Sequence, residues 1–255
     1  MTEESIQKIY NQLLNWEGKN ASLPYPIHKK LTVEGFGYND IYEWIADNYT
    51  LNSTSKILDA GCGVGFGSIS LSKYYNCNVL GISLSEQEVN KANEFALKEG
   101  VEDHVNFNQQ SYDDLPNESF DFIVAIESVK HTLNIDVTIK SLKNALKPGG
   151  TLLIVDDFLI NSKETPTIRK YASDWELKVL LVENDFISDF SIKKDLTPFV
   201  KGKNNFVLHS SILILNILQP VFKFAKIIRG GLFLERLFNQ EVMKYYVLEF
   251  KKDSV

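Results

Sequence analysis

A glycine-dense turn between an apolar strand and a helix constrains this chain more than any other feature of its sequence. The run Ile57-Leu58-Asp59-Ala60 is apolar apart from Asp59, and four of the next seven residues are glycine: Gly61, Gly63, Gly65 and Gly67. Glycine permits positive φ and lets a ligand press against bare main chain. The start of a helix also offers free N–H groups to an anion. We therefore predict a ligand-binding turn at the carboxyl end of this strand, where ligands bind in doubly wound folds.

Apolar strand-like runs alternate with helix-like segments over the next hundred residues. Strands are expected at Lys56–Asp59, Asn78–Ile82, Val105–Phe107, Phe120–Ile126 and Thr151–Val155. Helices are expected between them at Val64–Tyr74, Glu86–Lys98 and Ile135–Leu146, with Gly100 as a C-cap of the second. This alternation predicts an α/β, doubly wound Rossmann-like fold with a mostly parallel sheet and helices on both faces.

The flanking segments are less regular. The pattern of residues 1–50 predicts two helices around a loop that contains two prolines. In the second half, the pattern predicts a helix at Ile168–Glu183, a strand at Ile187–Ile192, an apolar helical stretch at 206–240 and a closing strand at Tyr245–Phe250. Since no linker interrupts the chain, we expect one domain over 1–255 with a helical cap from both ends.

Charge and cysteine content narrow the function classes. The 255 residues hold 27 Lys and Arg against 33 Asp and Glu, a net charge of −6, and only three of the basic residues are Arg. Nucleic-acid binding, which relies on a basic face rich in Arg, is not expected. Cys62 and Cys77 cannot build a disulfide framework, and the acidic N-terminus does not resemble a signal peptide, so we expect a cytoplasmic protein. No ligand spacing suggests a metal site.

The glycine turn departs from two common nucleotide-binding patterns. Phe66 stands where a dinucleotide fingerprint needs its third glycine, and no Lys follows the glycines as a Walker loop requires. The stretch Asp59–Gly65 instead resembles the first motif of class I S-adenosylmethionine-dependent methyltransferases. Gln110–Ile123 resembles the adenine-side loop and fourth strand of these enzymes, and Leu146–Ile154 resembles the turn into their fifth strand.

This resemblance implies an enzyme that uses S-adenosylmethionine as its cofactor and a sheet of seven strands. It also implies different roles for different segments of the chain. Residues 1–50 would form a helical cap, 51–160 the cofactor-binding half, and 161–255 the substrate half, with an apolar lid inserted at about 200–240.

The resemblance also names cofactor contacts. Asp59, Gly61, Gly63 and Gly65 are expected around the methionine part of the cofactor. Ser83 replaces the acid that usually ends the second strand, and the residues after it are similar to the Thr-Leu-Ser-x-x-Gln stretch of the sterol, tocopherol and cyclopropane-fatty-acid branch. The remaining expected contacts are Ser83, Leu84 and Gln87 on the ribose side, Ser111 and Tyr112 on the adenine side, and Ile126.

Glu127 and His131 follow the fourth strand, where the same branch carries a Glu-x-x-x-His stretch beside the methyl donor. If this segment is helical, the two side chains share one face. A carboxylate can stabilise a carbocation or accept a proton, and a His of ordinary pKa is a base near neutral pH, so we predict both as catalytic residues. In the alternative, they only cap a turn and bond a loop. Asp157 and His28 are lesser candidates.

The apolar stretch near 206–236 bears on the methyl acceptor. With the basic residues that follow, it predicts a lid for a small lipophilic acceptor, such as an isoprenoid, quinone or sterol-like compound, and C-methylation is slightly favoured over O- or N-methylation. The same stretch also fits a homodimer interface or a peripheral membrane contact. The alternative function is a non-catalytic, cofactor-binding scaffold or regulatory protein.

Overall fold

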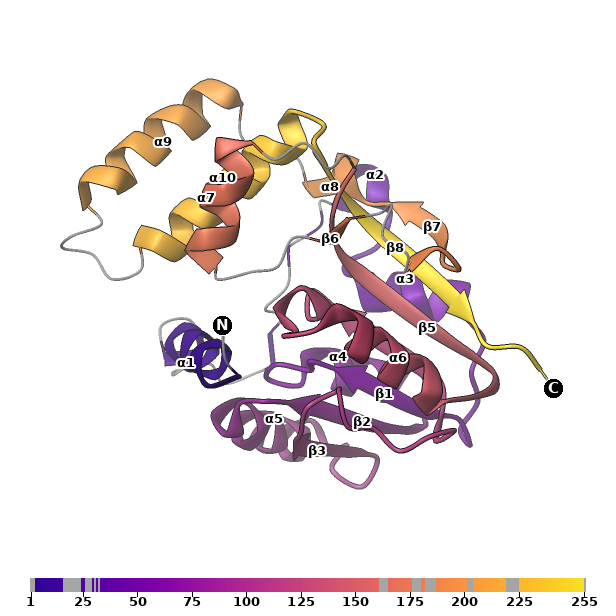
Figure 1. Ribbon diagram of the computed structural model, residues 1–255. Helices are drawn as coiled ribbons and strands as arrows, with labels where there is room; N and C mark the ends of the chain where they lie inside the picture. Colours follow the sequence, from indigo (N-terminus) through magenta and orange to yellow (C-terminus); the bar gives the residue numbers. More distant parts are fainter. Residues whose placement is uncertain are drawn as a thin grey trace.

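The computed structural model is an α/β fold in which one mixed sheet has helices on both faces and a group of helices beyond one edge (Figure 1). It describes residues 3–15, 24–25, 29, 31, 33–160, 165–175, 180–181, 187–200, 204–218 and 225–254. None of the helices in these ranges is both long and apolar enough to cross a membrane.

The sheet has the strand order β3-β2-β1-β4-β5-β8-β7, and a two-residue strand, β6, pairs with β5 beside this path. The strands are β1 (Lys56–Ala60), β2 (Asn78–Ser83), β3 (Val105–Gln109), β4 (Phe120–Ile126), β5 (Leu146–Leu159), β6 (Leu180–Leu181), β7 (Ser191–Asp195) and β8 (Met243–Lys251). The pairings among β1 to β6 are parallel, while β8 runs antiparallel to β5 and β7. The predicted doubly wound, mostly parallel sheet is confirmed.

The strand order reverses between β1 and β4. From β1 the chain moves outward through β2 to β3, and it then crosses to β4 on the other side of β1. The carboxyl ends of these parallel strands meet at one edge of the sheet. Such a switch point is where open α/β sheets bind ligands, so the fold places the glycine turn after β1 at the expected position.

Each face of the sheet has its own helices. Ile57 and Leu58 are adjacent in β1 and fully buried, but they belong to different core clusters because side chains alternate along a strand. The cluster of Ile57 includes residues of three helices that lie against the sheet, together with residues of several cap helices, and the cluster of Leu58 includes residues of one α-helix. The first three helices are α3 (Ile41–Asn48), α4 (Phe66–Tyr75) and α5 (Glu86–Glu99), and the fourth is α6 (Ile135–Ala145). As predicted, Gly100 ends α5 in the left-handed conformation.

The remaining helices form the cap. They are α1 (Glu3–Leu13), α2 (Val33–Phe36), α7 (Pro166–Trp175), α8 (Thr197–Val200), α9 (Asn205–Leu218) and α10 (Ala225–Asn239). Helix α10 packs against both α7 and α9. Arg229 of α10 links all three, because its guanidinium binds the Asp174 carboxylate at 2.5 Å and donates to Asn216 Oδ1 at 2.9 Å. In Figure 1, α9 is the outermost of these helices.

Two expectations for the second half are wrong. The helix expected at Ile168–Glu183 ends at Trp175, and Leu180–Leu181 pairs with the end of β5 instead. The strand expected at Ile187–Ile192 lies later, at Ser191–Asp195. The apolar run that suggested it begins with a turn whose Ile187 is buried in the core. Apolar residues mark burial here, and pairing with β8 decides which residues form the strand.

Candidate active site at the carboxyl edge of the sheet

The glycine turn leaves β1 and lies directly against the end of β4. Gly61, Gly63 and Gly65 have φ of 90°, 52° and 85°, in the left-handed region that glycine adopts readily. Gly61 lies so close to Ser128, just after β4, that an added Cβ atom would overlap its side chain. Ser128 Oγ also donates to Ala60 O at 2.6 Å, which holds the two strand ends together. The turn therefore presents bare main chain at the switch point.

Main-chain donors remain available in this turn. The N–H groups of Gly61 and Cys62 both donate to Ile82 O at 2.9 Å. Those of Gly63 and Val64 donate to no acceptor within the ranges that the structure describes. They lie just before α4, whose N-terminus favours negative charge, so a ligand carboxylate can bind here without displacing an internal hydrogen bond.

Asp59 supplies a carboxylate beside the same turn. Its side chain is buried in β1 and accepts a hydrogen bond from Ser68 Oγ of α4 at 2.7 Å. Burial raises the pKa of Asp59 to about 6, although the Ser68 hydrogen bond acts in the opposite direction. The carboxylate is mostly ionised above that pH, so it can stabilise an ammonium group close to the anion-binding N–H groups.

The end of β2 differs from the expectation by one residue. Ser83 is buried and donates to Glu88 Oε2 at 2.6 Å, whereas Gln87 is exposed on the first turn of α5. Counted from Ser85, the Ser-x-x-Gln spacing falls on Glu88 and not on Gln87. Glu88 Oε1 is buried and has no hydrogen-bond partner among the residues that the structure describes. Burial raises the pKa of Glu88 to about 7.

Helix α1 covers this part of the edge. Gln7 donates to the carbonyl oxygen of Leu84 at 2.8 Å, and Ser85 Oγ donates to Asn11 Oδ1 at 2.6 Å. Leu84 therefore contributes its main-chain carbonyl group to a contact with α1. Sequence patterns gave no sign of these contacts, because an amphipathic helix does not name its partner.

The predicted adenine-side residues lie between β3 and β4. Tyr112 is buried beside Ile82 and donates its hydroxyl to Ser128 O at 3.1 Å. Ser111 is partly exposed and accepts a hydrogen bond from Asp113 N at 3.3 Å. Ile126 is buried as the last residue of β4. Tyr112 and Ile126 thus both lie close to Ser128, Tyr112 through this hydrogen bond and Ile126 two positions before it in the chain.

Glu127 is held in a strained and highly polar position. Its φ is 50°, which is unusual for a residue other than glycine, and its N–H donates to Val155 O at 2.7 Å. Its Oε1 accepts from Lys29 N at 2.6 Å and from the Tyr245 hydroxyl at 2.9 Å. A short 3-10 helix begins only at Val129, so Glu127 and His131 do not share a helical face as expected.

Lys130, which lies between Glu127 and His131 in the sequence, carries a buried ammonium group. Lys130 Nζ is 3.0 Å from Asp156 Oδ1, 2.9 Å from Asp157 Oδ2 and 3.5 Å from Glu127 Oε2. Burial lowers the pKa of Lys130, but the three carboxylates raise it by more, so the ammonium stays charged. Tyr171 of α7 donates to Asp157 at 3.2 Å. Lys130 is not recognisable as a site residue from the sequence, because a lysine after an apolar strand is usually solvated.

His131 lies apart from this cluster, against α1. Its Nε2 is 2.5 Å from the Tyr10 hydroxyl, and the two rings meet edge to face with centroids 5.1 Å apart. Burial, and then the nearby Lys130, lower the pKa of His131 to about 3. The expected imidazole titration near pH 6–7 is therefore wrong, and His131 is neutral at physiological pH. His28 lies outside the described residues.

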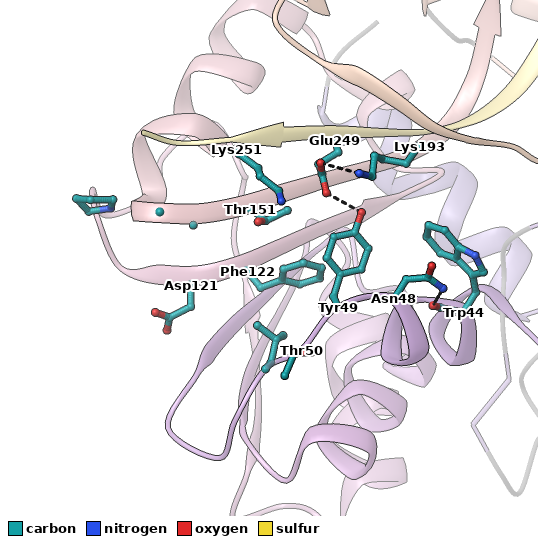
Figure 2. A pocket seen from close by; sticks show the side chains of 14 residues that line it. Trp44, Asn48, Tyr49, Thr50, Asp121, Phe122, Thr151, Lys193, Glu249 and Lys251 are labelled. Atoms are coloured by element: carbon teal, nitrogen blue, oxygen red, sulfur yellow. Dashed lines mark hydrogen bonds and ion pairs between the residues drawn. The ribbon is translucent and has the colours of Figure 1, made fainter. Parts of the chain in front are cut away.

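A cavity of about 520 Å³ lies at the opposite, amino end of β4 and β5. Figure 2 shows Tyr49 and Lys193 converging there on Glu249, with distances of 2.8 and 3.2 Å to its carboxylate oxygens. None of the predicted site residues lines this cavity. It is separate from the edge that carries the glycine turn.

The sequence of this chain matches the model of one protein family over more than half of its length. A family model for the methyltransferase domain matches residues 51–202, which includes the glycine turn, the end of β2 and the segment after β4. The chain belongs to the methyltransferase domain family. This confirms the predicted enzyme class. The predicted cofactor, S-adenosylmethionine, agrees with solved structures of the same fold that hold S-adenosyl-L-homocysteine.

The chain is also similar in sequence to methyltransferases of known name. It is 33% identical over 109 residues to a sterol 24-C-methyltransferase of Gibberella zeae, covering 42% of this chain and 29% of the relative. It is 32% identical over 166 residues to a 2-methyl-6-phytyl-1,4-hydroquinone methyltransferase of Synechocystis, covering 60% of this chain and 49% of the relative. The chain thus spans less than half the length of either relative.

Its fold matches that of a solved structure nearly throughout. A geranyl diphosphate C-methyltransferase of Streptomyces coelicolor, solved with Mg²⁺, geranyl diphosphate and S-adenosyl-L-homocysteine, superposes with a TM-score of 0.72. The match covers 99% of this chain and 97% of that one at 15% identity. At this identity the likeness concerns the fold.

The residues at the carboxyl edge fit the cofactor. The free N–H groups of Gly63 and Val64 suit its carboxylate, and Asp59 suits its ammonium group. The unpartnered oxygen of Glu88 is an acceptor for a hydroxyl group at the end of β2, where the common ribose-binding acid is absent.

We predict that Gly63→Ala weakens S-adenosylhomocysteine binding at least tenfold in isothermal titration calorimetry. A Cβ atom at φ of 52° costs about 1 kcal/mol in strain and occupies the main-chain surface that the ligand needs. Gly100→Ala is the matched control, since Gly100 has φ of 67° and open space around an added Cβ atom. Equal affinities in the two variants would exclude the turn as the cofactor site.

A second prediction concerns Glu88 and stability. Because the folded-state pKa is raised from 4.5 to about 7, the folded protein holds the extra proton and its free energy of unfolding falls as pH rises through this window. Glu88→Gln removes this loss, which amounts to at most about 3 kcal/mol. The variant should therefore gain stability relative to wild type between pH 5 and pH 8 in urea unfolding, while Glu86→Gln, exposed on the same turn, should not. A difference between Glu88→Gln and wild type that stays constant with pH would contradict the raised pKa.

Proposed function

We propose that this protein transfers the methyl group of S-adenosylmethionine to a small lipophilic acceptor of isoprenoid, quinone or sterol-like type, with C-methylation favoured over O- or N-methylation. The observation that carries the proposal is the buried, net-negative cluster after β4 and β5, next to the glycine turn. The names of the two curated relatives support an apolar acceptor.

The cofactor side is assigned to residues at the ends of β1, β2 and β4. They are Asp59, Gly61, Gly63 and Gly65, then Ser83, Leu84 and Glu88, and Ser111, Tyr112 and Ile126. When bound, S-adenosylmethionine supplies an electrophilic methyl group on a cationic sulfur. Glu88 takes the role first given to Gln87, because its carboxylate and not the Gln87 amide lies beside Ser83.

The acceptor side is assigned to Glu127, His131 and their neighbours. Glu127, Asp156 and Asp157 bring three negative charges, while Lys29 and Lys130 bring two positive ones, so the ionised cluster carries one net negative charge. A net negative, buried environment stabilises positive charge that develops on an acceptor carbon. With its pKa lowered to about 3, His131 stays neutral and is a weak base, so its proposed role is to orient groups by hydrogen bonding.

The cap completes the proposed site. We assign residues 1–50 to a cover over the edge, 51–160 to cofactor binding and 161–255 to acceptor binding, with 200–240 as an apolar insertion. Two contacts support this division. Tyr10 of α1 reaches His131, and Tyr171 of α7 reaches Asp157, so helices from both ends of the chain meet the segments after β4 and β5.

A second candidate is a cofactor-binding protein that does not transfer methyl groups. The saturation of Glu127 favours it, because four hydrogen-bond donors already surround this carboxylate. The two candidates differ in turnover. Incubation with methyl-labelled S-adenosylmethionine and a panel of a prenylated hydroquinone, a sterol and a prenyl alcohol should yield a labelled product with one of them, and NMR then assigns the methyl group to carbon, oxygen or nitrogen. Cofactor binding without turnover on any acceptor would favour the scaffold.

We predict that Glu127→Gln and His131→Ala each lower kcat by about 100-fold, with the KM for S-adenosylmethionine within threefold of wild type. Exposed His104→Ala serves as the control and should retain wild-type kcat. Because the pKa of His131 is lowered to about 3, the wild-type pH–rate profile should show no His131 limb between pH 6 and 7. Wild-type kcat in both variants would make the pair structural, and a limb at pH 6–7 that disappears in His131→Ala would contradict the lowered pKa.

A further inference from the structure

Helix α9 carries apolar side chains on its outer surface. Phe206 is 81% exposed and Ile217 is 70% exposed, although both are large and apolar. The helix contains no charged residue over its 14 positions. The exposed apolar side chains of α9 are Phe206, Val207, Leu213, Ile214 and Ile217.

These side chains form one stripe along the helix. At about 100° per residue they occupy an arc of roughly 120°, in which Ser210 is the one polar residue. The opposite side of the helix is buried through Leu208 and Ile212, and α9 packs there on α10. The Arg229–Asn216 hydrogen bond also joins α9 to α10, and the high exposed fractions of the apolar side chains show that the stripe faces solvent.

The sequence around the stripe has a charge opposite to that of the whole chain. Between Leu196 and Leu234 there is no Asp or Glu and there are four Lys and one Arg, the Arg229 that is paired with Asp174, whereas the full chain has a net charge of −6. The rest of the chain must therefore carry −11. An apolar stripe within a locally basic segment of the sequence is complementary to a surface that is both apolar and anionic.

A second copy of the chain fits this stripe poorly. A 14-residue helix is about 21 Å long and about 10 Å wide, so one face offers on the order of 200 Å². A stable protein interface buries about 800 Å² on each partner. A symmetric dimer would also place the two basic segments against each other.

We infer that α9 is a docking element for an anionic lipid bilayer and lies in the plane of its surface. The stripe of α9 enters the boundary between headgroups and acyl chains, and the lysines that precede and follow α9 in the sequence provide attraction to the anionic headgroups. The inference depends on the surface of α9 alone and is independent of which acceptor is methylated.

Vesicle co-sedimentation of the full chain tests this inference. We expect binding to vesicles of phosphatidylcholine with 30% phosphatidylglycerol, and at least tenfold weaker binding to phosphatidylcholine alone or in 0.5 M NaCl. The double variant Phe206→Ser/Ile217→Ser should bind the anionic vesicles at least tenfold more weakly. Leu97→Ser removes a side chain of α5 that is 65% exposed, and should change binding less than twofold.

A fluorescence measurement keeps the test independent of the double variant's folding. Phe206→Trp should show a blue shift and quenching by brominated lipids on anionic vesicles, while Leu97→Trp should show neither. Light scattering then gives the oligomeric state. Failure of the wild-type chain to bind anionic vesicles would overturn the inference, as would equal binding by the double variant. A wild-type dimer that Phe206→Ser/Ile217→Ser converts to monomers would assign α9 to a homodimer interface instead.

Discussion

The buried ammonium group of Lys130 is the interaction on which the carboxyl edge of the sheet depends. Asp156 and Asp157 are consecutive, buried and both within 3.0 Å of this one nitrogen. Two adjacent carboxylates repel each other strongly in a low-dielectric interior, and one of them would bind a proton if the cation were absent. Removing one member of such a buried pair typically costs about 3–5 kcal/mol. Without the positive charge of Lys130, the ends of β4 and β5 could not hold these ionised carboxylates in a buried position.

The same cluster holds the strained backbone of Glu127. Lys29, Tyr245 and Lys130 all bind its carboxylate, and together they join a segment near the N-terminus, β8 and the turn after β4. A residue other than glycine at φ of 50° persists only where its surroundings determine it, and here several hydrogen bonds do so. Strain of this kind concentrates at binding and catalytic sites, which agrees with the position of Glu127 beside the glycine turn.

Local patterns in the sequence predicted the architecture well, because strand–turn–helix alternation and glycine turns are properties of neighbouring residues. The predicted strand–turn–helix at β1 and α4, and the end of α5 at Gly100, are confirmed on this basis. Contacts between distant segments were not predictable in the same way. Nothing near Tyr10 indicates that it meets His131, 121 positions later, and Lys130 is recognisable only once its three acidic partners are in place. The sequence also does not distinguish Gln87 from Glu88 as the residue beside Ser83. A shift of one residue at the start of a helix turns a side chain by about 100° and exchanges a solvated position for a buried one.

Helix α1 joins two parts of the edge that the sequence treats as separate. Gln7 and Asn11 lie one turn apart and contact the residues after β2, while Tyr10 between them contacts the residue that closes the turn after β4. The two regions thus share a single cover only three turns long. Any displacement of this helix breaks both sets of contacts at once, so access to the two regions is coupled by the length of one short helix, and neither can be opened to solvent alone.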